Sequence, residues 1–250
     1  MSVEPVIEVN NLNFSYNNIS VLENISFAVQ KGDYVGIIGP NGGGKTTLLK
    51  ILVGLLNPQS GSIKIFGTDL QKLKHRSEIG YVPQRIAQEN ISFPATVYEI
   101  VESGLIAKKG LSGDITEEDK QAIDKALEMA NISNLKNRLM SSLSGGQRQR
   151  VYVTRALASD PKILILDEPF TGVDIVSQKD FYSFLKDLNT KNHLTILFVS
   201  HDIDTITTEI KTVLCLNRGL FCYGAKELMH EGNTIEELYG KNVTHIHHGK

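Results

Sequence analysis

A glycine-rich stretch at residues 39–46, GPNGGGKT, has the clearest chemical meaning in the sequence. It fits the pattern G-x-x-x-x-G-K-[ST], in which glycines let backbone N–H groups converge on phosphate oxygens at the start of a helix. Lys45 is expected to reach the β- and γ-phosphates, and Thr46 is expected to hold Mg²⁺. The position of the stretch, between an apolar run and a helical run, favours nucleotide binding over a turn that binds nothing. The expected nucleotide contacts are Gly39, Pro40, Asn41, Gly42, Gly43, Gly44, Lys45, Thr46 and Thr47.

Two adjacent carboxylates, Asp167 and Glu168, follow the apolar run ILIL. Because successive side chains of a strand alternate, they are expected to point to opposite sides. Asp167 can then anchor Mg²⁺ through its water shell, while Glu168 faces the γ-phosphate and polarises the attacking water or accepts its proton. A single acid at a strand end is often a helix cap or a solvated charge. The pair, in a chain that also has the glycine pattern, favours catalysis.

A second glycine motif, LSGGQ at residues 143–147, precedes a helical run that extends to Leu157. It offers a serine hydroxyl, open backbone N–H groups and a helix N-terminus, so a second anion site is expected there. Taken alone, the same letters would describe a turn and a helix cap. The residues of this candidate site are Ser144, Gly145, Gly146 and Gln147.

The elements that must position these residues can be predicted from hydrophobic periodicity. Alternating residues at 12–16, 25–29 and 63–65 predict strands of an antiparallel sheet that is solvated on one face. Residues 34–38, 162–166 and 195–199 are apolar on both faces and predict a parallel α/β core.

Three helical regions complete the prediction. One helix is expected at 45–56, before Asn57 and Pro58, and another after Ser177. Between the first two core strands lies an insertion that is predicted to be helical, with a capping-box-like start at Thr116 and Asp119.

In combination, the glycine pattern, the LSGGQ motif and the strand that ends in Asp167 and Glu168 resemble the ATP-binding cassette (ABC) ATPase family over nearly the whole chain. The resemblance implies an α/β fold: a P-loop NTPase (RecA-like) core with an antiparallel β subdomain and an inserted helical subdomain. Residues 1–250 would form a single ABC ATPase domain. The core and β subdomain would occupy 1–91 and 144–225, the helical subdomain 92–143 and a C-terminal extension 226–250.

The resemblance also implies partners and cofactors. ATP and Mg²⁺ are the expected cofactors. Two copies are expected to pair head to tail, with the LSGGQ motif of one copy closing over the ATP held by the other. Such two-fold pairing is the commonest form of protein dimer.

Four further residues match positions of this family. Tyr16 resembles the aromatic residue that stacks on adenine, although an isolated strand aromatic needs no ligand. Gln84 resembles the glutamine that contacts Mg²⁺ and reports to the membrane subunit, or is a polar turn residue. Asp174 resembles the aspartate of the dimer-spanning loop, although TGV precedes it instead of the commonest SAL. His201 follows an apolar strand, where its imidazole can bond to the γ-phosphate. The expected catalytic set is Glu168, His201, Lys45 and Gln84, and the expected Mg²⁺ set is Thr46, Gln84 and Asp167.

Composition excludes several other classes. The 26 basic and 28 acidic residues among 250 give a formal net charge of −2, which argues against nucleic acid as a partner. No apolar run approaches the roughly 20 residues that cross a bilayer, and the N-terminus has no pattern of a secretory signal. Cys215 and Cys222 lie in apolar, strand-like stretches and are expected to be small hydrophobic fillers in a reducing cytosol, with a metal or disulfide role as the alternative.

The resemblance implies an ATPase that is peripheral to the cytoplasmic face of the cell membrane. It would energise transport through separate permease subunits served by an extracytoplasmic solute-binding protein. A soluble ATPase of the same superfamily, serving DNA repair, chromosome organisation or translation, is the alternative. Those relatives tend to carry long coiled-coil or zinc-module insertions or two cassettes, whereas this chain has one cassette and a short helical lobe.

The transported solute is inferred from a different segment. Residues 92–101, SFPATVYEIV, resemble the zinc and manganese uptake branch, so zinc is expected first and manganese second. An iron chelate, haem or another solute is the alternative. In the tail, His245, His247 and His248 either bind Zn²⁺ or belong to a frayed polar end.

Overall fold

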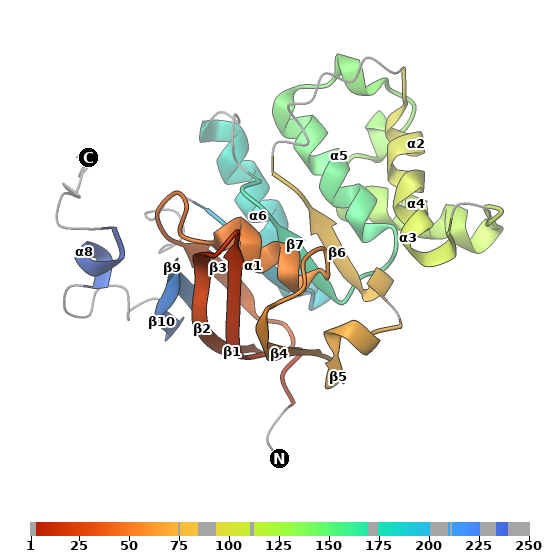
Figure 1. Ribbon diagram of the computed structural model, residues 1–250. Helices are drawn as coiled ribbons and strands as arrows, with labels where there is room; N and C mark the ends of the chain where they lie inside the picture. Colours follow the sequence, from red (N-terminus) through yellow and green to blue (C-terminus); the bar gives the residue numbers. More distant parts are fainter. Residues whose placement is uncertain are drawn as a thin grey trace. The chain divides into compact units, whose positions relative to one another are not determined.

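The computed structural model describes residues 4–74, 76–84, 94–110, 113–169, 175–200, 210, 212–225 and 234–239 (Figure 1). Asp174, His201 and the tail histidines lie outside these ranges. The chain forms two compact units. The P-loop unit contains residues 4–29, 35–70 and the described residues after 200, and the helical unit contains residues 30–34 and the described part of 71–200. No helix within the described ranges is long and apolar enough to span a membrane.

An antiparallel sheet forms one part of the P-loop unit. Its order is β2 (Ile19–Val29), β1 (Ile7–Tyr16), β4 (Ser60–Ile65) and β5 (Thr68–Asp69). Buried side chains alternate along β1 with more exposed ones, which confirms the predicted sheet. Asn17 and Asn18 connect β1 to β2 with φ angles of 47° and 66°. Asparagine tolerates this left-handed conformation, which the tightest hairpin turns require.

The glycine pattern follows β3 (Tyr34–Ile38), a strand in which every residue is buried. Its residues 35–38 pair in parallel with β9 (Thr212–Asn217), and β9 continues through a hairpin into β10 (Gly219–Ala225). A last helix, α8 (Thr234–Tyr239), packs on β9 and β10 through the buried Leu238.

Helix α1 (Lys45–Leu52) begins where predicted but ends four residues earlier than the expected residue 56. The reason is Gly54, which adopts φ 73° after the C-cap Val53. The N–H of Gly54 bonds to the carbonyl of Ile51 at 2.9 Å, and the N–H of Leu55 bonds to that of Lys50 at 2.8 Å. This pair of bonds is a Schellman motif, which satisfies the last carbonyls of a helix and stops it.

Parallel strands form the core of the helical unit. They are β6 (Ile79–Val82), β7 (Ile163–Leu166) and β8 (Thr195–Val199), with β7 between the other two. All residues of β7 and β8 are buried, as predicted for strands covered on both faces. Helix α6 (Ile175–Asn192) contacts β8 and buries the apolar residues predicted for its inner face, Phe181, Phe184, Leu185 and Leu188.

The insertion is helical, as predicted. Helices α2 (Val97–Glu102) and α4 (Glu117–Met129) pack against α5 (Gly145–Leu157), and α3 (Ile106–Lys109) lies between α2 and α4 in the sequence (Figure 1). The predicted capping box is present, because Thr116 Oγ1 accepts from the N–H of Asp119 at 3.3 Å and Asp119 Oδ2 accepts from the N–H of Thr116 at 2.8 Å. Short 3₁₀ helices occur at Leu70–Lys72, Arg76–Glu78, Ser103–Leu105, Ser133–Leu135 and Met140–Ser142.

The cysteines differ from the prediction. Both lie on strands, as expected, but Cys215 of β9 and Cys222 of β10 form a disulfide instead of acting as unbonded fillers. They are register partners in the antiparallel pair, with Cα atoms 4.8 Å apart. This separation falls within the usual range for a disulfide.

Candidate nucleotide-binding and catalytic site

Lys45 is anchored at the base of the glycine-rich loop. Its Nζ donates to the carbonyl oxygens of Gly39 and Pro40, both at 2.8 Å, and its side chain is buried. A buried ammonium needs such acceptors because the loss of water disfavours its charge. The loop therefore holds the cation close to its own backbone, where a phosphate group would be bound.

The start of α1 is suited to an anion. Its N-cap is Gly44, which has φ 94° and has no side chain that could accept a bond from the first helical N–H groups. A Cβ at this position would lie 2.7 Å from the carbonyl oxygen of Val21, so glycine is also required by space. The first N–H groups of a helix carry partial positive charge, which favours a phosphate. The local structure thus fits the nucleotide phosphates predicted from the sequence.

The hairpin of β9 and β10 contacts the glycine-rich loop through backbone atoms. A Cβ on Gly39 would lie 1.9 Å from the carbonyl oxygen of Leu216, so only glycine permits this close approach. The N–H of Arg218 donates to the carbonyl of Gly43 at 3.0 Å, and the carbonyl of Arg218 accepts from the N–H of Glu23 at 2.9 Å. Leu216 and Arg218 were missed by the sequence analysis, because their backbone atoms make these contacts and no side-chain type marks them.

Tyr239 of α8 also reaches the loop. Burial raises the pKa of its phenol, and a hydrogen bond with the backbone of Gly39 opposes that rise. Asn217 Nδ2 donates to the carbonyl of Leu238 at 3.0 Å and ties the same helix to β9. The sequence alone had no signal for this contact.

Tyr16 lies at the end of β1 with 44% of its surface exposed. Its ring meets the ring of Phe14 edge to face, with centroids 4.8 Å apart. An exposed ring that is fixed by a neighbour offers a free face for stacking. This position is compatible with the adenine contact suggested by the family resemblance.

The acidic residues belong to the helical unit. Asp167 is buried directly after β7, and its N–H donates to the carbonyl of Val82 at 2.9 Å. Tyr81 of β6 lies close enough to be affected by this carboxylate: burial and then the charge of Asp167 raise the pKa of the Tyr81 phenol. The phenol consequently stays protonated and neutral next to the carboxylate. A neutral polar group disfavours the charged form of a buried carboxylate less than an apolar side chain would.

Glu168 and Gln84 are brought together by the fold. Gln84 Nε2 donates to Glu168 Oε2, although 84 residues separate them in the sequence. The sequence predicted that the side chains of Asp167 and Glu168 point to opposite sides because both residues continue a strand, and this reason is wrong. Strand β7 ends at Leu166, and Glu168 adopts φ 49°, a left-handed conformation that a strand does not contain.

The LSGGQ motif forms the N-terminus of α5. Ser144 Oγ accepts from the N–H of Gln147 at 3.2 Å, and Gln147 Oε1 accepts from the N–H of Ser144 at 3.1 Å. Gly145 and Gly146 occupy the first turn of the helix. The helix is held from behind by the half-buried Arg150, whose guanidinium donates to the carbonyls of Ala130 and Asp180 and stacks on Phe184. The structure is thus compatible with both possibilities for the motif, a helix cap and an anion site. The cap uses the serine hydroxyl, and the N–H groups of the two glycines lie in the first turn of the helix.

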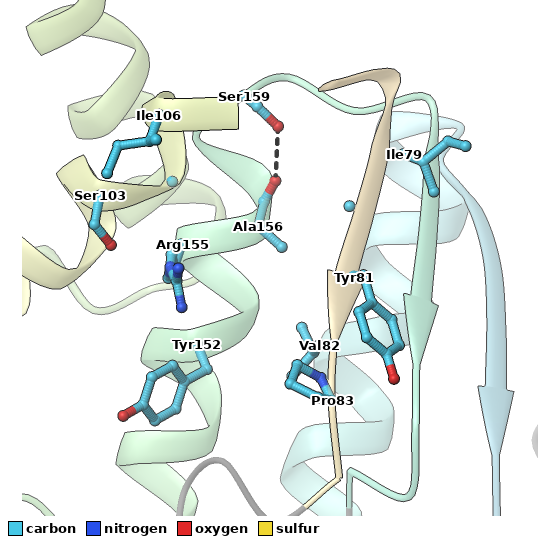
Figure 2. A pocket seen from close by; sticks show the side chains of 12 residues that line it. Ile79, Tyr81, Val82, Pro83, Ser103, Ile106, Tyr152, Arg155, Ala156 and Ser159 are labelled. Atoms are coloured by element: carbon cyan, nitrogen blue, oxygen red, sulfur yellow. Dashed lines mark hydrogen bonds between the residues drawn. The ribbon is translucent and has the colours of Figure 1, made fainter. Parts of the chain in front are cut away.

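A cavity of 470 Å³ lies between β6 and the helical insertion. Figure 2 shows Tyr152, Arg155 and Ala156 along α5, with Val82 and Pro83 across the cavity. Ile106 lines the cavity and is 45% exposed. Because Gln84 immediately follows Pro83, this cavity borders the segment that reaches the carboxylate of Glu168.

Within the described ranges, no group of three or more His, Cys, Asp or Glu residues could hold a metal ion by itself. The hydroxyl of Thr46 and the carboxylate of Asp167 are hard oxygen donors, the kind that Mg²⁺ prefers, and this ion usually retains water and binds phosphates as well.

Comparisons with known proteins define the class to which this fold and site belong. The profile of the family described as ABC transporter matches residues 22–171. The chain belongs to the ABC transporter family, whose ATP-binding subunits are ATPases that drive transport. A particular relative, the zinc uptake system ATP-binding protein ZurA of Listeria innocua, is 45% identical over 226 residues, which cover 90% of this chain and 88% of that protein.

Solved structures confirm the predicted fold class. One is cbiO1 from Clostridium perfringens, part of the ABC transporter complex cbiONQ, with a TM-score of 0.81 at 27% identity and 94% coverage of both chains. Another is a dimeric ATP-binding cassette in a post-hydrolysis state bound to ADP and phosphate. It has a TM-score of 0.72 at 27% identity and covers 88% of this chain and 98% of its own.

Proposed function

We propose that this chain is the ATP-hydrolysing subunit of a membrane importer for a divalent metal ion, with zinc first and manganese second. The observation that supports hydrolysis is the placement of Glu168, which accepts a hydrogen bond from Gln84 and directly follows the buried Asp167. The support for zinc is the relative from Listeria innocua, which is a zinc uptake protein and matches most of this chain.

Each part of the site has a role in hydrolysis. The N–H groups of residues 39–47 bind the phosphates, and Lys45 exchanges its carbonyl partners for phosphate oxygens as ATP binds. Thr46, Gln84 and Asp167 would hold Mg²⁺, which would neutralise charge on the phosphates. Glu168 orients the attacking water and accepts its proton, and His201 bonds to the γ-phosphate. Tyr16 stacks on adenine.

A second copy of the chain completes the site. The dimer is head to tail, so that Ser144, Gly145, Gly146 and Gln147 of one copy contact the ATP bound by the other. Asp174 lies in the loop that spans the dimer. ATP favours the closed dimer because it makes contacts with both copies that the open state lacks, and hydrolysis removes that preference.

The chain works at the cytoplasmic face of the cell membrane with separate permease subunits and an extracytoplasmic solute-binding protein. We place the permease contact in the cavity of Figure 2. Its apolar wall at Val82, Pro83 and Ile106, with the guanidinium of Arg155 inside, fits an apolar permease segment that carries one acidic residue. A segment seated there would press on β6 and alter the position of Gln84.

The contact is tested by comparing two substitutions of exposed apolar residues in the same insertion. Ile106→Asp places a charge in the cavity, whereas Leu139→Asp places one on a surface that is outside it, where Leu139 is 43% exposed. Ile106→Asp is expected to prevent co-purification with the permease and leave the ATPase rate of the isolated subunit unchanged. Equal retention of both variants would contradict this placement.

Transport is tested in membrane vesicles that contain the complete transporter. Glu168→Gln is expected to retain ATP binding and abolish uptake, because the amide cannot accept the proton of water. Glu78→Gln is the matched control, since Glu78 precedes β6 and pairs with Lys162 on an exposed surface. Uptake of Zn²⁺ that depends on Glu168 would support the proposal. If only the uptake of Mn²⁺ or of an iron chelate depended on Glu168, that solute would replace zinc in the proposal. If no membrane partner were found, a soluble ATPase would be favoured.

A further inference from the structure

The disulfide between Cys215 and Cys222 lies where it can affect nucleotide binding. Cys215 pairs with Ile38, the last residue of β3 before the glycine-rich loop. The residue after Cys215 is Leu216, whose carbonyl oxygen approaches Gly39. Two residues further on, the N–H of Arg218 bonds to the carbonyl of Gly43. The covalent link therefore joins β10 to the short stretch of β9 that supports the loop.

The two sulfur atoms are unequally accessible. Cys215 is fully buried, whereas Cys222 is partly exposed. A register shift between Leu220 and Cys222 interrupts the regular pairing, and Phe221 is 42% exposed at this point. Thiol–disulfide exchange requires an accessible sulfur, so reagents are expected to react at Cys222.

Strand pairing would keep the thiols in place after reduction. The pairs on either side, Leu220 with Leu216 and Tyr223 with Leu214, belong to the same ladder and do not depend on the sulfur atoms. Tyr223 also donates from its hydroxyl to the carbonyl of Ala28 in β2. The bond can therefore open and close without separation of the strands.

Disulfides in the cytosol are uncommon, and those that occur are mostly transient and redox-sensing. This argument uses the cytoplasmic location proposed above. A bond that only added stability would be of little use there, because thiol reductants would keep it open. A bond that is connected to the glycine-rich loop can instead make nucleotide binding depend on the thiol redox state.

We propose that Cys215 and Cys222 are a thiol–disulfide redox site whose oxidised form fixes the β9–β10 hairpin beneath the glycine-rich loop and strengthens ATP binding. The oxidant is a low-molecular-weight disulfide. The thiolate of Cys222 attacks one of its sulfur atoms and releases one thiol, and the thiolate of Cys215 then attacks Cys222 Sγ and releases a second. Two cysteine thiols lose two electrons and two protons, which the two released thiols carry away.

The test uses the purified full chain in buffers with different ratios of reduced to oxidised glutathione. The number of free thiols is measured by alkylation and mass spectrometry, and the Kd for a non-hydrolysable ATP analogue is measured in the same samples. We expect the Kd to rise by about threefold or more as the bond opens, and to fall again on reoxidation. Because both states are those of the wild-type chain, the comparison does not depend on how a variant folds.

Cys222→Ser is the control, since it changes one atom at the partly exposed position and prevents the bond. Its Kd should be independent of the glutathione ratio and should resemble that of the reduced wild type. The proposal is overturned if the bond forms without a change in Kd, if the thiols remain free in the most oxidising buffer, or if Cys222→Ser responds as well. The glutathione titration measures nucleotide binding, whereas the vesicle assay measures uptake. Failure of this inference can therefore be distinguished from failure of the proposed function.

Discussion

Gln84 donates a hydrogen bond from its amide nitrogen to the carboxylate of Glu168. The bond connects the end of β6 to the residue that we assign as the base, and the cavity of Figure 2 borders the same segment. The amide can therefore hold the base in one position and release it when β6 moves. This bond would connect the proposed permease contact to the proposed chemistry.

Replacement of Gln84 by alanine tests that connection. We expect turnover to fall by about tenfold, since a hydrogen bond to a charged group contributes about 1.5–3 kcal/mol and Glu168 would lose part of its orientation. ATP affinity should change by less than about twofold, because residues 39–47 provide most of the phosphate contacts. The measurement is a steady-state ATPase assay together with nucleotide titration. An unchanged turnover would show that this bond does not position the base.

Tyr81→Phe tests the support of Asp167. The raised pKa of Tyr81 keeps its phenol neutral, and the substitution removes only its hydroxyl group. The concentration of Mg²⁺ needed for half-maximal ATPase activity should rise by about twofold or more, since the substitution places an apolar edge beside a buried carboxylate and disfavours its charge. Tyr152→Phe on α5 is the matched control. An equal Mg²⁺ requirement in both variants would contradict the role of Tyr81.

Lys45→Ala tests the P-loop. Loss of the ammonium is expected to weaken ATP binding by about tenfold or more, because charge-assisted bonds to phosphate oxygens disappear. Lys50→Ala removes the same charge from the last turn of the same helix and should leave the affinity within about twofold. Isothermal titration of both variants with ATP measures these affinities. Equal affinities would show that Lys45 serves only the loop carbonyls.

Ser144 has two separable roles, as a helix cap and as a ligand of the partner's nucleotide. Ser144→Asp keeps a good N-cap but adds a negative charge, so α5 should remain stable while ATP-driven dimerisation is lost. Ser144→Ala removes the cap at a cost of about 1 kcal/mol and adds no charge. Thermal unfolding and light scattering with ATP distinguish these effects. Dimerisation of Ser144→Asp at the wild-type ATP concentration would exclude the ligand role.

Asp119 predicts a pH dependence of stability. A hydrogen bond from the Lys109 ammonium and further ones from the N–H and hydroxyl of Thr116 lower the pKa of Asp119 far below its usual range. A depressed pKa contributes stability that is present at neutral pH and is lost as the pH falls below the ordinary aspartate value. The urea midpoint of Asp119→Asn should be lower than that of wild type at pH 7, and the difference should shrink below about pH 4. Asp124→Asn, which alters an exposed pair on the same helix, should show little difference at any pH.

The predictions from sequence succeeded where a local pattern determines the structure. Thr116 and Asp119, three residues apart, indicated a helix start, and alternation along residues 12–16 indicated the strand that extends over Ile7–Tyr16. The end of α1 was missed because the signal used was Pro58, whereas Gly54 had already stopped the helix. Helices often end at a glycine well before a proline is reached.

The remaining features depend on contacts between distant segments. The bond from Gln84 to Glu168 and the approach of Leu216 to Gly39 join parts of the chain that have no shared periodicity. The sequence did not favour the disulfide because its cysteines are seven residues apart on neighbouring strands, and the register shift at Phe221 determines which residues face each other. The roles of Asp174 and His201 stay predictions.

The pairing of β3 with β9 has a consequence for how the chain is made. Val35 pairs with Thr212, so the ribosome must add roughly 180 further residues after β3 before its partner exists. At about 5–20 residues per second, this interval lasts on the order of 10–35 seconds. During that time the apolar strand β3 has no partner in β9 and Gly39 lacks the backbone of Leu216 beside it. A nascent chain can therefore complete its ATP pocket only after β9 has been synthesised, and until then β3 is a target for chaperones or for aggregation.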